Sequence, residues 1–247
     1  DNITTVEDLY APYKPKRRTR ASIAREKGLH GLADMILTQA RTPGEADRMA
    51  QGFLNEQVTT VEEALAGARD IVAETISDHA EVRASTRRKA MQWGMLAAEK
   101  IEDAKDEKAV YEVYYEFESR VDKLRPHQVL AINRGETEKV LRVKVTLEEK
   151  DWKGSIVDYF RPDLRSPFCD ELEIAINDSA ERLLLPAIER DVRRELTIAA
   201  ETHAIKVFAA NLRALLGQPP LLNQTVLGLD PGFRTGTKLA VVGPTGK

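Results

Sequence analysis

Hydrophobic side chains recur at helical spacing near the start of the chain and predict two short helices. Residues 22–27 form the first, which we expect to end near Gly28. Residues 29–40 form the second, with apolar positions four apart at Leu32 and Ile36. Two short helices joined at a glycine are typical of a helix-turn-helix, although the turn residues here do not identify one by themselves.

Capping residues predict two further helix starts. Thr42 with Glu45, and Thr60 with Glu63, have the spacing of a capping box. In this motif the threonine and the glutamate each accept a hydrogen bond from a backbone N–H of the first turn. The helix after Thr60 carries apolar residues on one face, which we expect to be buried: Leu65, Ala68, Ile71, Val72 and Ile76.

A longer helix is predicted from a cap at Asp78 to about Lys100, with Val82 and Met95 among its apolar positions. Its other face is basic, and we expect that face to be solvated, with phosphate contact as the alternative: Arg83, Arg87, Arg88 and Lys89. The aromatic residues that follow are expected to pack between helices: Tyr111, Tyr114, Tyr115 and Phe117.

The second half of the chain combines one strand with long helices. Residues 126–136 fit either a helix begun by a proline or a strand, and residues 141–147 alternate apolar and polar positions as a half-buried strand does. Residues 170–217 are strongly helical, and we expect Pro186 to kink this region or to start a new helix. His203 lies on the apolar stripe and is predicted to be packed.

The pattern changes again beyond residue 220. Residues 226–230 and 238–242 are apolar runs separated by the turn-rich residues 231–236, which is typical of a β-hairpin. We therefore expect three regions: residues 1–125, helical with a basic segment; residues 126–220, a small β element and long amphipathic helices; and residues 221–247, the opening hairpin of another domain.

Composition narrows the classes of protein to consider. The chain has 247 residues, of which 42% are hydrophobic and 6% are aromatic, so a core of aliphatic side chains favours helices. A single cysteine, Cys169, excludes an internal disulfide framework and favours the cytosol. No apolar run approaches the ~20 residues of a membrane helix. The chain begins without methionine and stops inside a hairpin, so we expect it to be a fragment of a longer protein.

Positive charge is concentrated near the N-terminus. The net charge is −3, but residues 13–27 hold seven basic residues and one acidic residue, which makes this segment +6 and the remainder −9. Such a cluster suits a polyanion, because each neutralised phosphate releases condensed counterions, and a solvated loop is the alternative. The candidate nucleic-acid-binding residues are Lys14, Lys16, Arg17, Arg18, Arg20, Arg25 and Lys27. Residues 99–118 are acidic and are expected to form a solvated helix face and loop.

Asp230 is the one acidic residue in a distinctive setting, at the end of a predicted buried strand and before a glycine-containing turn. A carboxylate placed there can bind a hard cation, as in two-metal nucleic-acid enzymes, or can accept hydrogen bonds from its own turn. A two-metal site needs several carboxylates, so Asp230 alone cannot form one. The sequence also has no HExxH, Walker A or GxSxG motif, and we predict no catalytic residue, no metal site and no cofactor.

Several longer stretches resemble the bacterial Tex transcription accessory proteins. They are LYAPYKPKRRTR (residues 9–20), IAREKGL (23–29), EEALAGARDI (62–71), LAINRGE (130–136), RLLLPAIER (182–190) and LDPGFRTG (229–236). The resemblance covers essentially the whole chain and implies a cytoplasmic, elongated, largely helical protein that binds nucleic acid with little sequence preference and influences transcription. In such proteins a YqgF-type ribonuclease-H-like domain, helix-hairpin-helix elements and an OB-fold RNA-binding domain accompany the helical region.

The resemblance implies that this chain holds the central helical scaffold and the first hairpin of the ribonuclease-H-like domain. We therefore expect a mainly α fold and a non-catalytic nucleic-acid-binding function, with no membrane and no small-molecule substrate. Asp230 matches the first acidic position of ribonuclease-H-like nucleases, so a metal-dependent nuclease or resolvase is one alternative. A scaffold that contacts the transcription machinery is the other, in which the basic segment pairs with acidic residues such as those at 99–118.

Overall fold

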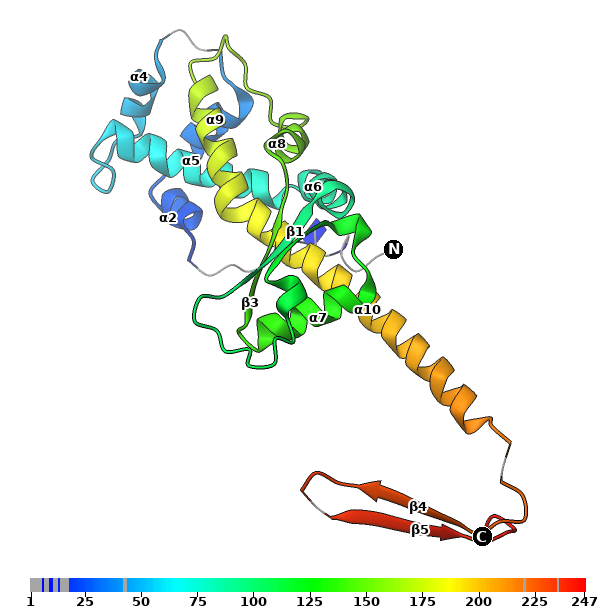
Figure 1. The fold of residues 1–247 in the computed structure, drawn as a ribbon. Coiled ribbons are helices and arrows are strands. Elements are labelled where there is room, and N and C mark those ends of the chain that lie inside the picture. The colour runs from blue at the N-terminus through cyan, green and yellow to red at the C-terminus, as the bar shows by residue number, and fades with distance from the viewer. Residues whose placement is uncertain are drawn as a thin grey trace. The chain divides into compact units, whose positions relative to one another are not determined.

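The computed structural model describes residues 6, 9–10, 13, 18–41, 44–219, 221–234 and 236–247. The chain divides into two compact units, Asp1–Glu201 and Thr202–Lys247. The first unit is a helical assembly with a small antiparallel sheet, and the second contains a β-hairpin (Figure 1). The fold is mainly α, as the hydrophobic pattern predicts.

Helix α5 (Val61–Asp78) is the centre of the first unit and packs against α2 (Arg20–Glu26), α3 (His30–Thr38) and α9 (Cys169–Asp178). The other helical elements are α4 (Ala46–Ala50), η2 (Gln51–Phe53), α6 (Ala80–Trp93), η3 (Glu112–Tyr114), η4 (Val121–Lys123), α7 (Pro126–Thr137), α8 (Glu149–Val157), η5 (Ser179–Leu184) and α10 (Leu185–Leu216). Residues 126–136, which the sequence leaves open, are helical because Pro126 occupies the first turn, where its missing N–H costs nothing.

The cap and the apolar stripe of α5 are those that the sequence predicts. Thr60 accepts a hydrogen bond from the Glu63 N–H at 3.2 Å, and the Glu63 carboxylate accepts from the Thr60 N–H at 3.4 Å. All five predicted apolar residues are at most 5% exposed. Gly67 lets α2 and α3 pack closely against α5, because a Cβ at this position would collide with Cδ1 of Leu29.

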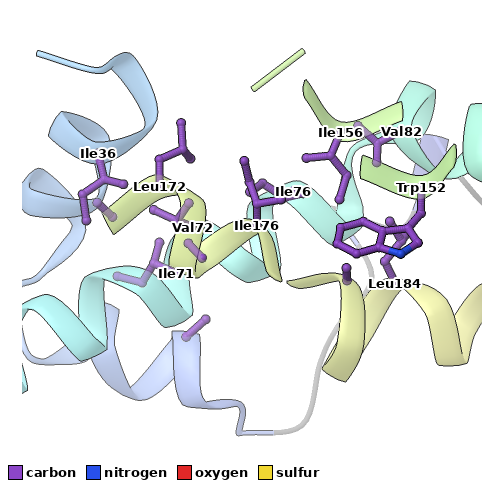
Figure 2. Packing of buried hydrophobic residues seen from close by; sticks show 14 of the residues in the cluster. Ile36, Ile71, Val72, Ile76, Val82, Trp152, Ile156, Leu172, Ile176 and Leu184 are labelled. Atoms are coloured by element: carbon purple, nitrogen blue, oxygen red, sulfur yellow. The ribbon is translucent and has the colours of Figure 1, made fainter. Parts of the chain in front are cut away.

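The core runs from α3 and α5 through α9 to α6 and α8. Figure 2 shows Ile36 of α3, Val72 and Ile76 of α5, and Leu172 and Ile176 of α9 in one layer. Trp152 and Ile156 of α8 continue this layer beside Val82 and Leu184. Burying each of these aliphatic side chains is worth about 1.5–3 kcal/mol, so this continuous layer is what holds the helices together.

The three-stranded antiparallel sheet has the order β2-β1-β3, with β1 (Met95–Lys100) between β2 (Glu116–Arg120) and β3 (Leu141–Thr146). Strand β3 confirms the alternation at 141–147. Strand β1 corrects the prediction of a helix reaching Lys100, since α6 ends at Trp93. Met, Leu, Ala, Glu and Lys all favour helix locally, but backbone pairing on both sides outweighs that preference.

Gly94 is the local signal for this change, because it follows the last residue of α6 and adopts an extended conformation. The predicted cap at Asp78 is also wrong. Asp78 is the last residue of α5, and the side chain of His79 accepts the hydrogen bond from the Val82 N–H at the start of α6.

Helix α9 leads through the π-helical turn of η5 into α10, so that α10 begins at Leu185, next to Pro186. Proline has no N–H to donate to the carbonyl of Arg182, four residues earlier, and its ring would crowd that carbonyl in a regular helix. The wider turn before Pro186 accommodates both effects. The chain stays helical from Cys169 to Leu216, so no separate helix starts at Pro186, and the π-helical turn before it is the departure from a regular helix.

Other expectations need correction. Helix α4 begins at Ala46 with Glu45 as its cap residue, so Glu45 precedes the helix instead of lying in its first turn; Thr42 and Pro43 lie outside the described residues. The acidic segment 99–118 is strand, loop and 3-10 turn rather than a helix face. Tyr111 is buried against Val140 and Leu141, beside the sheet and α7 rather than between helices.

In the second unit, β4 (Val226–Pro231) pairs with β5 (Thr237–Val242) in the register Val226↔Val242. The predicted hairpin is confirmed, but both of its faces are exposed, whereas the sequence predicts a buried strand. His203 is exposed too, which corrects its prediction as a packed histidine.

Candidate nucleic-acid interface

The basic segment, residues 13–27, includes α2 and is followed by α3, and hydrogen bonds and a buried leucine fix the ends of this helix pair. Thr19 caps α2: its hydroxyl accepts from the Ser22 N–H at 3.0 Å, and the Ser22 hydroxyl accepts from the Thr19 N–H at 2.9 Å. Gly28 then turns the chain with a φ of 81°, in the left-handed region that favours glycine. Leu29 is 1% exposed and fixes the turn to the core. The helix–glycine–helix arrangement of residues 20–38 is therefore as the sequence predicts.

Four of the seven candidate cations can be placed, because Lys14, Lys16 and Arg17 lie outside the described residues. Arg18 makes a surface ion pair with Glu26 at 3.2 Å, with side chains 72% and 61% exposed. Arg25 donates to Glu74 of α5 at 2.7 Å. The Glu74 side chain is 9% exposed, so this pair joins α2 to α5.

Arg20 also faces the acidic side of α5. Burial raises the pKa of Asp70, whereas the positive charges of Arg182 and Arg20 lower it. Arg182 donates to Asp70 at 2.9 Å and also pairs with Asp178. The ion pair of Arg25 with Glu74 therefore stabilises the helix pair against α5. Of the described cations in the segment, Arg18 and Arg25 form ion pairs, and their partners are Glu26 and Glu74 rather than the acidic residues at 99–118.

Helix α3 is the second helix of the pair, and its exposed side chains do not suit phosphate. Leu32, Ala33 and Ile36 are buried, and the exposed positions are His30, Asp34 and Thr38. The helix contains no lysine or arginine, and Asp34 would repel a nucleic-acid backbone. The excess positive charge of this region therefore lies before and within α2.

The basic face of α6 is not the solvated surface that the sequence predicts. Arg83 and Arg87 donate to one carboxylate of α10, Asp191, at 3.2 and 3.4 Å, and their side chains are only 17% and 12% exposed. Lys89 donates to the carbonyl of Asp151 at 2.9 Å. Arg88 remains exposed. Three of these four residues hold α6 against its neighbours.

Asp230 lies at an exposed position of β4 opposite Lys238. Among the residues that the structure describes, no group of three or more His, Cys, Asp or Glu side chains could hold a metal ion. The described part of this chain thus does not place Asp230 in a group of three or more such side chains.

Sequence reasoning missed the carboxylates that receive the basic residues: Glu62 and Asp70 lie within a quoted motif, whereas Glu74 and Asp191 lie outside all of them. Arg69 of EEALAGARDI links Glu62 and Glu171 at 2.7 and 2.8 Å. Asn133 of LAINRGE donates to Thr197, and Arg193 donates to Asn133 and Glu136. These motif residues join helices within the first unit.

No helix in the described part of the chain combines the length and the apolar character needed to cross a bilayer. The fold and the basic helix pair define a mainly helical module with a small antiparallel sheet. A protein-family model described as "Tex central region-like" matches residues 42–208. The chain belongs to this Tex family.

Three relatives with similar sequences support the assignment to this family. The chain is 46% identical over 245 residues to the uncharacterized protein YdcI of Bacillus subtilis, covering 98% of this chain and 34% of the relative. It is 36% identical over 252 residues to the transcriptional accessory protein Tex of Neisseria gonorrhoeae, covering 100% and 33%. It is 32% identical over 258 residues to the human S1 RNA-binding domain-containing protein 1, covering 97% and 25%. The chain spans between 25% and 34% of the length of these relatives.

Proposed function

We propose that this chain is the helical scaffold of a cytoplasmic, non-catalytic transcription accessory protein that binds nucleic acid with little sequence preference. The observation that carries the proposal is the +6 charge of residues 13–27, next to a rigid helix pair. The names of two relatives, a transcriptional accessory protein and an S1 RNA-binding domain-containing protein, support the same role.

The contact surface that we propose is the stretch from Lys14 to Arg20. Arg25 is engaged with Glu74, so its charge is already compensated within the chain. Arg18 is paired only with the exposed Glu26 among the described residues, and an exposed pair of this kind is worth less than about 1 kcal/mol. A phosphate can therefore replace Glu26 at little cost.

The test is binding of the 247-residue chain to single- and double-stranded oligonucleotides at two salt concentrations. We expect affinity to fall steeply with salt and to depend little on sequence. Arg17→Ala/Arg18→Ala/Arg20→Ala should weaken binding and reduce the slope of log K against log salt by about 0.7–0.9 per lost phosphate contact.

A matched variant, Lys105→Ala/Lys108→Ala/Lys206→Ala, removes the same charge at other exposed positions and should bind as the parent does. Unfolding curves confirm that each variant is folded. Absence of binding by the parent chain would place nucleic-acid binding in other parts of the longer protein. Mn²⁺-dependent cleavage that Asp230→Asn abolishes would support the nuclease alternative instead.

A further inference from the structure

The segment that joins α8 to α9 can be followed in Figure 1. A second basic surface, with Arg41, Arg161 and Arg165, lies where this segment contacts the residues that follow α3. Gln39, which is 8% exposed, fixes this segment through its side-chain amide. Its oxygen accepts from the Asp163 N–H at 3.0 Å, and its nitrogen donates to the Phe168 carbonyl at 3.1 Å. Phe168 is fully buried and anchors the end of the segment.

The turn itself is also closed by hydrogen bonds. Asp163 accepts from the Arg165 N–H at 3.0 Å through its side chain and from the Ser166 N–H at 2.8 Å through its carbonyl. The Ser166 hydroxyl donates to the carbonyl of Ala40 at 3.3 Å. Residues 161–168 are therefore held in one conformation by the core on one side and by their own turn on the other.

This fixed turn presents an apolar side chain among arginines. Leu164 is 94% exposed. It borders an open hollow of about 1090 Å³ that is also lined by Arg41, Arg161, Arg165 and Asp163. Arg41 pairs with Asp163 at 2.6 Å, whereas Arg161 and Arg165 are exposed and have no ion pair with any described residue. The lining residues thus carry a positive excess.

A single exposed leucine is ordinary on a protein surface, but Leu164 lies among three arginines on a backbone fixed by hydrogen bonds. The backbone is already ordered, which lowers the entropy cost of binding. All three cations are arginines, which are enriched at protein interfaces where lysine is depleted. A hollow with an apolar rim and guanidinium groups complements carboxylates that flank an apolar side chain. A phosphate group by itself offers no apolar partner to Leu164.

We propose that this hollow, formed by residues 38–41 and 161–165, binds an acidic protein segment that carries an apolar residue between its carboxylates. The surface is separate from the basic segment 13–27 and does not depend on the nucleic-acid function. Arg161 and Arg165 receive the carboxylates, Leu164 contacts the apolar residue, and Asp163 holds Arg41 in place.

The test is selection of random displayed peptides on the 247-residue chain, with counter-selection on an Arg161→Ala/Arg165→Ala variant. We expect the enriched peptides to contain aspartate or glutamate around an apolar residue. For the synthesised peptides, Arg161→Ala/Arg165→Ala should raise the Kd about tenfold or more, as truncation of interface arginines does. Leu164→Ser should raise it severalfold, and it should not affect folding because the side chain is exposed.

Lys105→Ala/Lys108→Ala is the charge-matched control and should leave the Kd unchanged. The proposal is overturned if the selection yields no acidic peptides, or if the selected peptides bind all variants equally. It is also overturned if Arg161→Ala/Arg165→Ala impairs oligonucleotide binding and leaves peptide binding intact, because the hollow would then be a nucleic-acid site.

Discussion

Gly135 is the residue at which the LAINRGE motif meets the sheet. A Cβ at this position would lie 2.6 Å from Cδ1 of Leu141 and 3.1 Å from Cδ1 of Tyr111. Gly135→Ala should therefore destabilise the first unit by about 1–3 kcal/mol, because overpacking exceeds the gain in helix propensity. Thermal unfolding measures the change. Gly154→Ala is the control, since its Cβ would meet only the flexible end of Lys89, and a loss of stability there as large as at Gly135 would contradict this account.

Asp106 should make the stability of the fold around Tyr111 and Tyr115 depend on pH. The N–H of Tyr111 contributes most to lowering the pKa of Asp106, and the N–H of Val110 and the hydroxyl of Tyr115 lower it further. Because the folded pKa lies below the ordinary value, the ionised carboxylate stabilises the fold above about pH 4 and ceases to do so as the pH falls through the folded pKa.

Asp106→Asn should therefore lower the free energy of unfolding at pH 7, and the difference from the parent should shrink toward pH 3. Urea unfolding at several pH values measures it. A difference that stays constant with pH would show that the carboxylate charge does not contribute.

At the scale of elements, Asp191 determines how α6 lies against α10. Arg83, Arg87 and Arg194 all donate to it within 3.4 Å, and its side chain is 16% exposed. Asp191→Asn should cost about 1–3 kcal/mol of stability, less than breaking a fully buried ion pair, because solvent reaches part of this cluster. Chemical denaturation tests this. Asp158→Asn, at an exposed position, should change stability by less than about 0.5 kcal/mol, and equal effects would refute the role of Asp191.

At the scale of the whole molecule, the two units should differ in local stability. Every residue of β4 and β5 is exposed, and a two-stranded ribbon is marginally stable by itself. Amide hydrogens of the hairpin should therefore exchange about a thousandfold or more faster than those of α5 around Val72. Hydrogen exchange followed by mass spectrometry resolves both regions. Equal protection would mean that another surface covers the hairpin.

The basic residues show how far the candidate site could be predicted. The charge density of residues 13–27 and the helix–glycine–helix arrangement are visible in the sequence. The partners of those charges are not, because Arg25 and Glu74 are 49 residues apart in the chain. The same holds for Arg83 and Asp191, which are 108 residues apart. A helical pattern indicates which face is polar, but it does not indicate whether that face meets solvent or another polar face.

Features that depend on neighbouring residues could be predicted from the sequence: the Thr60–Glu63 cap, the buried stripe of α5, the alternation of β3, the glycine turn at Gly28 and the hairpin at 226–242. Their energies come from contacts within a few residues, which local pattern encodes. Tertiary structure decided that Met95–Lys100 is a strand, because pairing with both β2 and β3 outweighs its helix propensity. It also decided which arginines join helices and which remain exposed, because desolvation and ion pairing are settled only when distant elements meet.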